Sequence, residues 1–78
     1  MRIAAPDELS ASLLAARLGR DRCRVVLESD GTWYLDDNRP PTPRHVAELL
    51  PEVRWWLVKE RIERTIVWIG EQPFAVSG

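Results

Sequence analysis

The side chains that could carry out chemistry are few in this chain. Cys23 and His45 are its only cysteine and its only histidine, and nothing in their spacing indicates that they meet. Nucleophilic catalysis needs such groups in contact with an activating partner, and phosphate binding by a loop needs a glycine-rich run that the sequence lacks. We therefore expect no enzyme activity and no cofactor. We interpret Cys23 as a half-buried structural residue and His45 as a surface residue.

Oxygen ligands gather between positions 30 and 38, where Asp30, Asp36, Asp37 and Asn38 offer the groups that calcium and magnesium prefer. Their spacing lacks the alternating acidic loop with a terminal glutamate that makes a calcium motif specific. Such side chains at turns and strand ends bond their own backbone, which explains all four. One Cys and one His cannot supply the four ligands of a structural zinc site. We predict no metal site.

Charge and composition indicate one ordinary globular domain over residues 1–78. Eleven Lys and Arg stand against twelve Asp and Glu, for a net charge of −1, and 45% of the residues are apolar. No basic block indicates nucleic acid or an anionic membrane as partner. The first residues lack the apolar run of a secretory signal, and no stretch approaches the about 18 apolar residues of a membrane span. We expect a cytoplasmic protein.

The N-terminal residues predict a helix from Pro6 to Leu18. Acidic residues suit its first turn, and Gly19 is placed to end it. Its core stripe is predicted to contain Leu9, Leu13 and Ala16, with Leu14 and Leu18 beside it. We expect a short edge strand at Met1–Ala4 before this helix.

A β-hairpin is predicted over Arg24–Glu28 and Thr32–Asp36. Asp30-Gly31 is a strong signal for a two-residue type I′ turn, in which both central residues need positive φ. Such a turn sets Glu28 opposite Trp33 and leaves both faces of the hairpin partly apolar. We therefore expect helices on one side of the sheet, and further chain or a partner on the other.

The second half begins with Thr42-Pro43, a good pair of residues for the N-terminus of a helix. Pro51 interrupts the helical spacing, so we expect two helices, at 43–50 and 51–63, with a single kinked helix as the alternative. Thr65–Ile69 is predicted to be an interior strand buried on both faces, and Phe74–Ser77 a last strand. The resulting order, α-β-β-α-α-β-β, predicts an α+β fold. Its antiparallel sheet has about four strands, and two or three helices pack on one face.

Trp55 and Trp56 are adjacent, in the most apolar third of the chain. Neighbouring helix positions point about 100° apart, so only one of the two rings can face the centre of a core stripe. Trp56 shares a face with Leu49 and Val53, whereas Trp55 shares one with Glu52. We expect Trp56 to lie in the core and Trp55 to stay partly exposed, where Trp beside Arg is a common composition of interface hot spots.

A longer pattern surrounds these tryptophans. Thr42 to Leu50 is followed by Val53-Arg54-Trp55-Trp56, by Glu60-Arg61-Ile62 and then by two predicted strands. This succession resembles the short helix-turn-helix and wing of phage excisionases and MerR-type regulators. The resemblance implies major-groove contacts from Arg54 and Trp55 and a phosphate contact from Arg64. The sequence departs from that pattern at Pro51-Glu52, which replaces the usual glycine-containing turn.

Two binding functions follow from these observations. We expect a small non-catalytic protein-binding module, an adaptor, inhibitor or regulator, acting on another protein or as a homodimer. Its apolar and aromatic surface is predicted to contain Trp55, Arg54, Lys59 and Trp33. The alternative is a DNA-binding winged helix-turn-helix regulator that uses residues 43–76. Glutamates interleaved with the basic residues of that segment repel phosphates, which makes DNA the less favoured partner.

Overall fold

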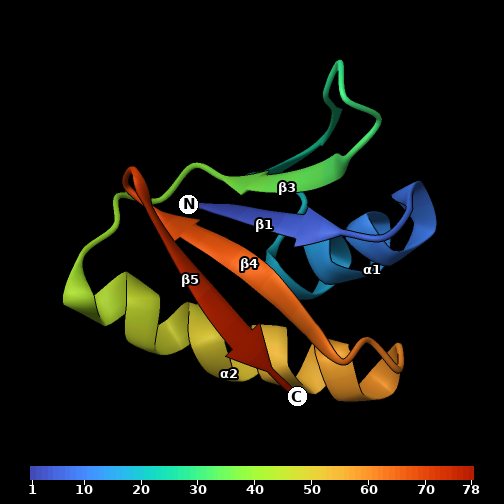
Figure 1. The fold of residues 1–78 in the computed structure, drawn as a ribbon. Helices are drawn as coiled ribbons and strands as arrows, with labels where there is room; N and C mark the ends of the chain where they lie inside the picture. The colour runs from blue at the N-terminus through green and yellow to red at the C-terminus, as the bar shows by residue number, and fades with distance from the viewer.

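The computed structural model describes all of residues 1–78 and contains two helices and five strands. In chain order these are β1 (Arg2–Ala5), α1 (Glu8–Leu18), β2 (Cys23–Leu27), β3 (Trp33–Asp37), α2 (Pro43–Lys59), β4 (Arg64–Ile69) and β5 (Gln72–Ser77). The strands form one antiparallel sheet in the order β2-β3-β1-β4-β5 (Figure 1). The predicted α+β class with an antiparallel sheet is confirmed, with five strands instead of about four.

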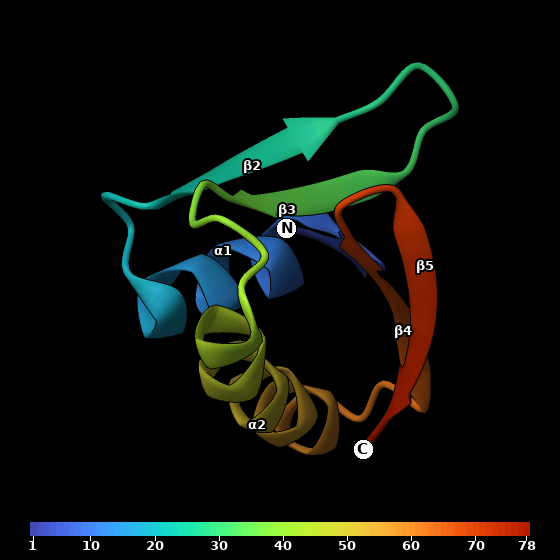
Figure 2. The same cartoon turned by 90° about the vertical axis from the view of Figure 1, so that its left-hand side faces the viewer.

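Each helix connects two strands that have a third strand between them. α1 joins β1 to β2 across β3, and α2 joins β3 to β4 across β1. This is the split β-α-β arrangement of ferredoxin-like sheets, extended here by β5 at one edge. Both helices lie on the same side of the sheet, which curves around them so that β4 and β5 descend beside α2 (Figure 2). β1 is the central strand, so the predicted edge position of this segment is wrong.

α1 ends at Leu18 as predicted but begins at Glu8, two residues later than expected, and its predicted core stripe is wrong. Asp7 caps the helix by accepting the Ser10 N–H at 2.8 Å, and Gly19, with φ +117°, ends it. The buried stripe is rotated from the expected one. It consists of Ser10, Ala11, Leu14, Ala15 and Leu18, and small residues in it let the helix approach its neighbours closely. Leu9 and Leu13, which the periodicity placed inside, are 69% and 44% exposed.

α2 is one helix and not two, so the predicted break at Pro51 is wrong, and the helix continues through Pro51 as the alternative required. Pro51 removes the N–H that would bond the Ala47 carbonyl. Both residues lie on the exposed side of the helix, where solvent can satisfy that carbonyl. The helix ends at Lys59, earlier than the predicted residue 63, and Arg61 follows in a left-handed conformation with φ +56°. The two helices that a helix-turn-helix requires are therefore not formed in this segment.

The β2–β3 hairpin exists, but its register differs by one residue from the prediction. Leu27 pairs with Trp33, because the loop has three residues and only Gly31 adopts positive φ, at +84°. The Gly31 N–H donates to the Glu28 carbonyl, and the Glu28 N–H donates to the Thr32 carbonyl. This is the pattern of a type I turn followed by a bulge. Val25 and Leu27 therefore lie on the helix side of the sheet.

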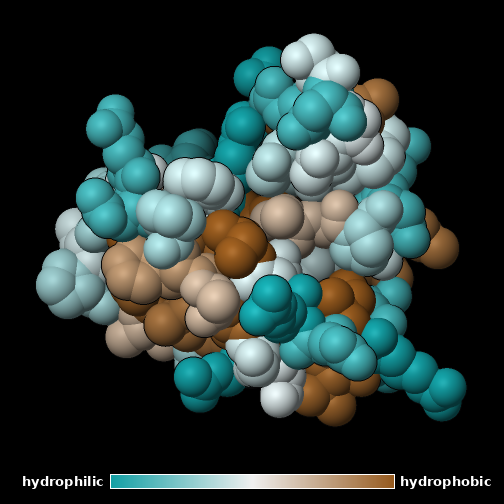
Figure 3. Space-filling model, viewed as in Figure 1, coloured by the Kyte–Doolittle hydropathy of each residue, from teal (hydrophilic) through white to brown (hydrophobic).

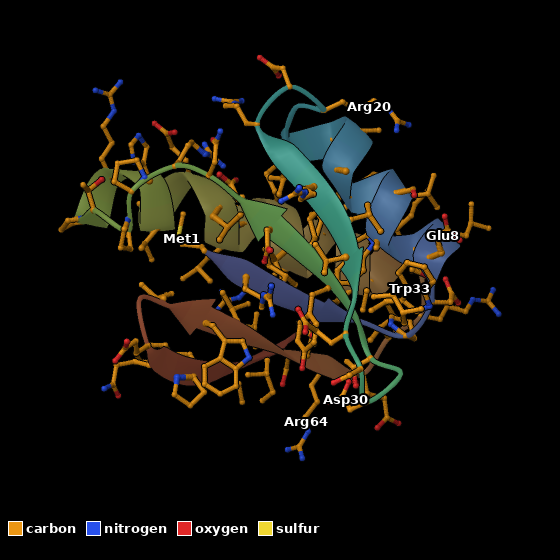
Figure 4. The ribbon with its side chains drawn as sticks, turned by 90° about the horizontal axis from the view of Figure 1, so that it is seen from above. Met1, Glu8, Arg20, Asp30, Trp33 and Arg64 are labelled. Atoms are coloured by element: carbon orange, nitrogen blue, oxygen red, sulfur yellow. The ribbon has the colours of Figure 1, made fainter.

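The core fills the space between the helices and the sheet. Its largest fully buried side chain is that of Trp56, and Ile3, Leu35 and Val67 meet the helices from the three central strands. β4 is interior in the sheet, as predicted, and β5 follows it after a turn at Gly70. The expectation that β4 is buried on both faces is wrong, since Trp68 and its neighbours on the other face are only half-buried. That second face, which no helix covers, is called the open face below (Figure 4).

Candidate protein-binding surface

The two adjacent tryptophans of α2 occupy opposite environments, as predicted. Trp56 is 1% exposed, and its indole Nε1–H donates to the Ser10 carbonyl of α1 at 2.8 Å. Trp55 is 44% exposed. The buried ring joins the two helices, so the neighbouring ring, about 100° further around α2, is turned to the outer surface.

Two cations lie against the Trp55 ring. The Arg17 guanidinium carbon of α1 is 3.7 Å from the ring centroid, and the Lys59 ammonium, one turn further along α2, is 5.5 Å from it. The Arg17 side chain also forms an ion pair with Glu52 on α2. This ion pair and the ring contact both hold the guanidinium over the indole, so the cluster links the two helices.

An exposed leucine adjoins this unit on α1. Leu13 is 44% exposed and precedes Arg17 by one helical turn, on the same side of the helix. We call the set Leu13, Arg17, Glu52, Trp55 and Lys59 the Trp55 surface. It presents apolar area beside two positive charges, only one of which has an ion-pair partner within the chain.

The four residues predicted to bind a partner do not form one site. Trp55 and Lys59 lie together, and Arg54 is exposed on α2 about 100° away from Trp55. Trp33 is half-buried against the core, where it pairs with Ala5 of the central strand β1. Arg17, which sequence reasoning missed, completes the aromatic site from the other helix. Only the helical spacing of Leu13 and Arg17 could have indicated that they share a face.

A second aromatic cluster lies on the open face of the sheet. Arg2 binds Asp36 through both carboxylate oxygens, at 2.6 and 2.8 Å, and Glu28 at 3.1 Å. Its guanidinium carbon is 4.8 Å from the centroid of the Tyr34 ring. Hydrogen bonds with Asp36 above all raise the pKa of Arg2. Both carboxylates pair with the only cation in contact with Tyr34, so this cluster, unlike the Trp55 surface, offers a partner no free cation against its ring.

A hollow of about 420 Å³ adjoins that cluster, lined by Arg2, Tyr34, Trp68, Gly70 and Glu71. Apolar side chains are also visible around β5 and α2 in Figure 3. Phe74 of β5 is 50% exposed, and Val58 of α2 is 66% exposed. Neither area combines an exposed tryptophan ring with a free cation.

Two of the aspartates considered for metal binding have local structural partners. Asp30 accepts the Thr32 N–H in the hairpin loop, and the Arg39 side chain holds Asp37. No group of three or more His, Cys, Asp or Glu side chains converges anywhere in the structure. Burial, with the negative charge of Asp37, raises the pKa of the Cys23 thiol, which keeps it in the less nucleophilic protonated form at neutral pH.

Comparison with known proteins does not place the chain in a family. No protein-family model matches the chain, and neither a curated protein nor a solved structure is significantly similar to it. Neither helix has the length and the apolar composition needed to span a membrane.

Proposed function

We propose that this chain is a small non-catalytic protein-binding module, of the kind that serves as an adaptor, inhibitor or regulator, and that it binds its partner through the Trp55 surface. The observation that carries the proposal is the exposed Trp55 ring with Arg17 stacked on it at 3.7 Å. Trp and Arg are the residue types most enriched in interface hot spots, and aromatic rings supply large contact area.

The contacts that Arg17 already makes within the chain add to the case for this surface. Association loses free energy when a flexible side chain is immobilised, by about 0.5–1.5 kcal/mol for each rotamer-rich residue. Arg17 is already held by Glu52 on one side and by the indole on the other. A partner that docks on the ring therefore finds it close to its bound conformation.

The charges define the chemistry of the partner. Lys59 contacts the ring but has no carboxylate within the chain, and Arg54 is exposed on the next face of the same helix without an ion pair. A protein surface that carries a carboxylate beside an apolar side chain complements this arrangement. Phosphates are less suitable, because Glu52 lies in the same cluster.

Affinity capture with matched variants tests this proposal. Wild-type protein, Trp55→Ala and Val58→Ala would be immobilised and exposed to lysate of the host cell, with folding of each variant checked by circular dichroism. Val58 is the control because it is an exposed apolar residue of the same helix, outside the Trp55 surface. We expect a protein that is retained by the wild type and by Val58→Ala and lost with Trp55→Ala.

The identified partner must then bind the purified wild type in calorimetry, with Kd raised by at least about tenfold in Trp55→Ala, as for a residue worth more than about 1.4 kcal/mol. Equal retention by all three proteins would contradict the proposal. So would micromolar binding of duplex DNA with a steep salt dependence, since counterion release is characteristic of phosphate contacts.

A further inference from the structure

The two edges of the sheet differ in how well they are protected from a further strand. At the end of β5, the Gly78 N–H bonds to the Glu63 carbonyl. Backbone groups in an antiparallel pair alternate in direction, so Val76 also turns towards β4 while Pro73 and Ser77 turn outward. Pro73 has no N–H, which interrupts the row of donors along this edge. Proline at such a position is a known protection against edge-to-edge pairing.

The β2 edge has no such protection. The Glu28 N–H donates to the Thr32 carbonyl at 3.0 Å, and the Asn38 N–H donates to the Arg22 carbonyl at 2.9 Å. Alternation then turns the backbone groups of Cys23, Val25 and Leu27 away from β3, where no other strand lies. None of these residues is proline, and the Leu27 side chain is 54% exposed. A strand with free donors, free acceptors and apolar side chains is a template for another strand.

One charge beside this edge has no partner within the chain. Arg24 is exposed on the open face and pairs in register with Asp36, but Arg2 already occupies both oxygens of that carboxylate. Glu28, at the other end of the strand, uses one oxygen for Arg2. β2 therefore has a free cation near one end and a carboxylate at the other. Two antiparallel copies of such a strand place opposite charges beside each other.

We propose that the β2 strands of two copies of this chain pair antiparallel about a two-fold axis at Val26, joining both sheets into one. In this register Val25 lies opposite Leu27 of the second copy, and the two exchange backbone hydrogen bonds from their outward-facing groups. Arg24 lies opposite Glu28 of the second copy, and symmetry repeats both pairs. Cross-strand pairs of opposite charge and of apolar residues stabilise antiparallel sheets.

The competing symmetric register is less favourable. An axis at Val25 would also match outward-facing backbone groups, but it would place Arg24 opposite Val26 and leave the cation without a partner. The axis at Val26 also covers the exposed Leu27 side chain with Val25 of the second copy. Because the contact is limited to one strand from each copy, the dimer is in concentration-dependent equilibrium with the monomer.

Sedimentation velocity over a range of concentrations tests the register through charge. Arg24→Glu places like charges opposite Glu28 in both symmetry-related pairs, and we expect it to raise the dimer Kd by about tenfold. Adding Glu28→Arg to this variant restores opposite charges and is expected to return Kd to near the wild-type value. Arg24 also lies opposite Asp36 and Glu28 also binds Arg2, so the stability of each variant is checked by urea denaturation before its dimer Kd is compared.

A matched pair of proline variants tests the edge itself. Val25→Pro removes an outward N–H of β2, whereas Ala75→Pro removes an outward N–H of β5, and neither removes a bond of the existing sheet. Val25 also packs against the core, whereas Ala75 is exposed, so circular dichroism must first show that both variants are folded. We expect folded Val25→Pro to be monomeric and Ala75→Pro to dimerise as the wild type does. A wild type that stays monomeric throughout would overturn the proposal. A dimer that resists both Arg24→Glu and Val25→Pro but dissociates with Trp55→Ala would also overturn it, by placing self-association on the Trp55 surface.

Discussion

The inner and outer faces of α2 carry the same residue type with different consequences. Trp56 is 1% exposed, with its indole N–H bonded to the Ser10 carbonyl, whereas Trp55 is 44% exposed under two cations. A buried indole whose donor is satisfied contributes packing that the fold depends on. The exposed indole contacts the charged ends of Arg17 and Lys59 at the surface. The orientation of the helix therefore separates a structural tryptophan from one that is free to bind.

The two faces of β3 repeat this contrast with aspartates. Asp36 lies on the open face and binds Arg2, with both side chains about one-third exposed. The next residue, Asp37, points to the helix side, where its side chain is fully buried and holds Arg39 at 2.7 Å. Arg39 extends this contact to Glu48 of α2. Removing one member of a buried pair leaves an uncompensated charge, while an exposed pair can rely on solvent.

We expect the largest loss in the free energy of unfolding when Trp56, the inner tryptophan, is substituted. Trp56→Ala removes the largest fully buried side chain and the bond to Ser10, so we expect it to reduce the free energy of unfolding by about 3–5 kcal/mol. Trp55→Ala should reduce it by less than about 1 kcal/mol, because the ring lies on the surface. Urea denaturation of both variants measures the difference, and equal losses would show that Trp55 is also structural.

We expect the second-largest loss in the free energy of unfolding when the buried ion pair of Asp37 and Arg39 is broken. Asp37→Asn keeps the shape of the side chain but leaves the Arg39 guanidinium, whose side chain is 11% exposed, without its main carboxylate. We expect a loss of about 3 kcal/mol in the free energy of unfolding, the lower end for breaking a buried pair. The same urea series would detect it. A loss below about 1 kcal/mol would indicate that Glu48 alone can compensate Arg39.

The sequence predicted well what local chemistry determines. Acidic residues in the first turn and Gly19 after the last one indicated α1, and β-branched residues with a turn at Gly70 indicated β4 and β5. The sequence also predicted that Trp56 is buried and Trp55 partly exposed, because helical geometry alone turns adjacent residues about 100° apart. These features depend on contacts within a few positions of the chain.

Features that depend on distant contacts could not be predicted. β1 is central because it pairs with β3 and β4, and four residues contain no sign of two later partners. The rotation of α1 about its axis follows from where α2 and the sheet lie, so Leu13 remained outside despite its periodicity. Arg17 reached the candidate site through the same packing. The hairpin register depended on whether Asp30 also adopts positive φ, and it does not.

Acid should weaken the contribution of the inner aspartate. Burial by itself would raise the pKa of Asp37, but hydrogen bonds from Arg39, with its charge and that of the N-terminus, outweigh this and lower the pKa. A carboxyl group with a lowered folded-state pKa stabilises the protein above its unfolded pKa of about 3.9 and loses that contribution as the pH falls through the folded value. The stability difference between wild type and Asp37→Asn should therefore be constant from about pH 5 to 7 and shrink below about pH 4. A difference that grows on acidification would contradict the assigned direction.

We expect the smallest loss in the free energy of unfolding when Asp36, the outer aspartate, is substituted. Asp36→Asn removes the main partner of Arg2, but the guanidinium keeps Glu28 at 3.1 Å, the Tyr34 ring and access to solvent. Exposed pairs contribute about 0–1 kcal/mol, so the loss should lie in that range and disappear in about 1 M salt, where charges are screened within about 3 Å. Asp37→Asn, measured in parallel, should keep most of its effect in salt because its pair is buried. Equal and salt-resistant losses in the two variants would mean that something covers the open face in solution. That result would direct the search for a partner from the Trp55 surface to the cluster of Arg2 and Tyr34.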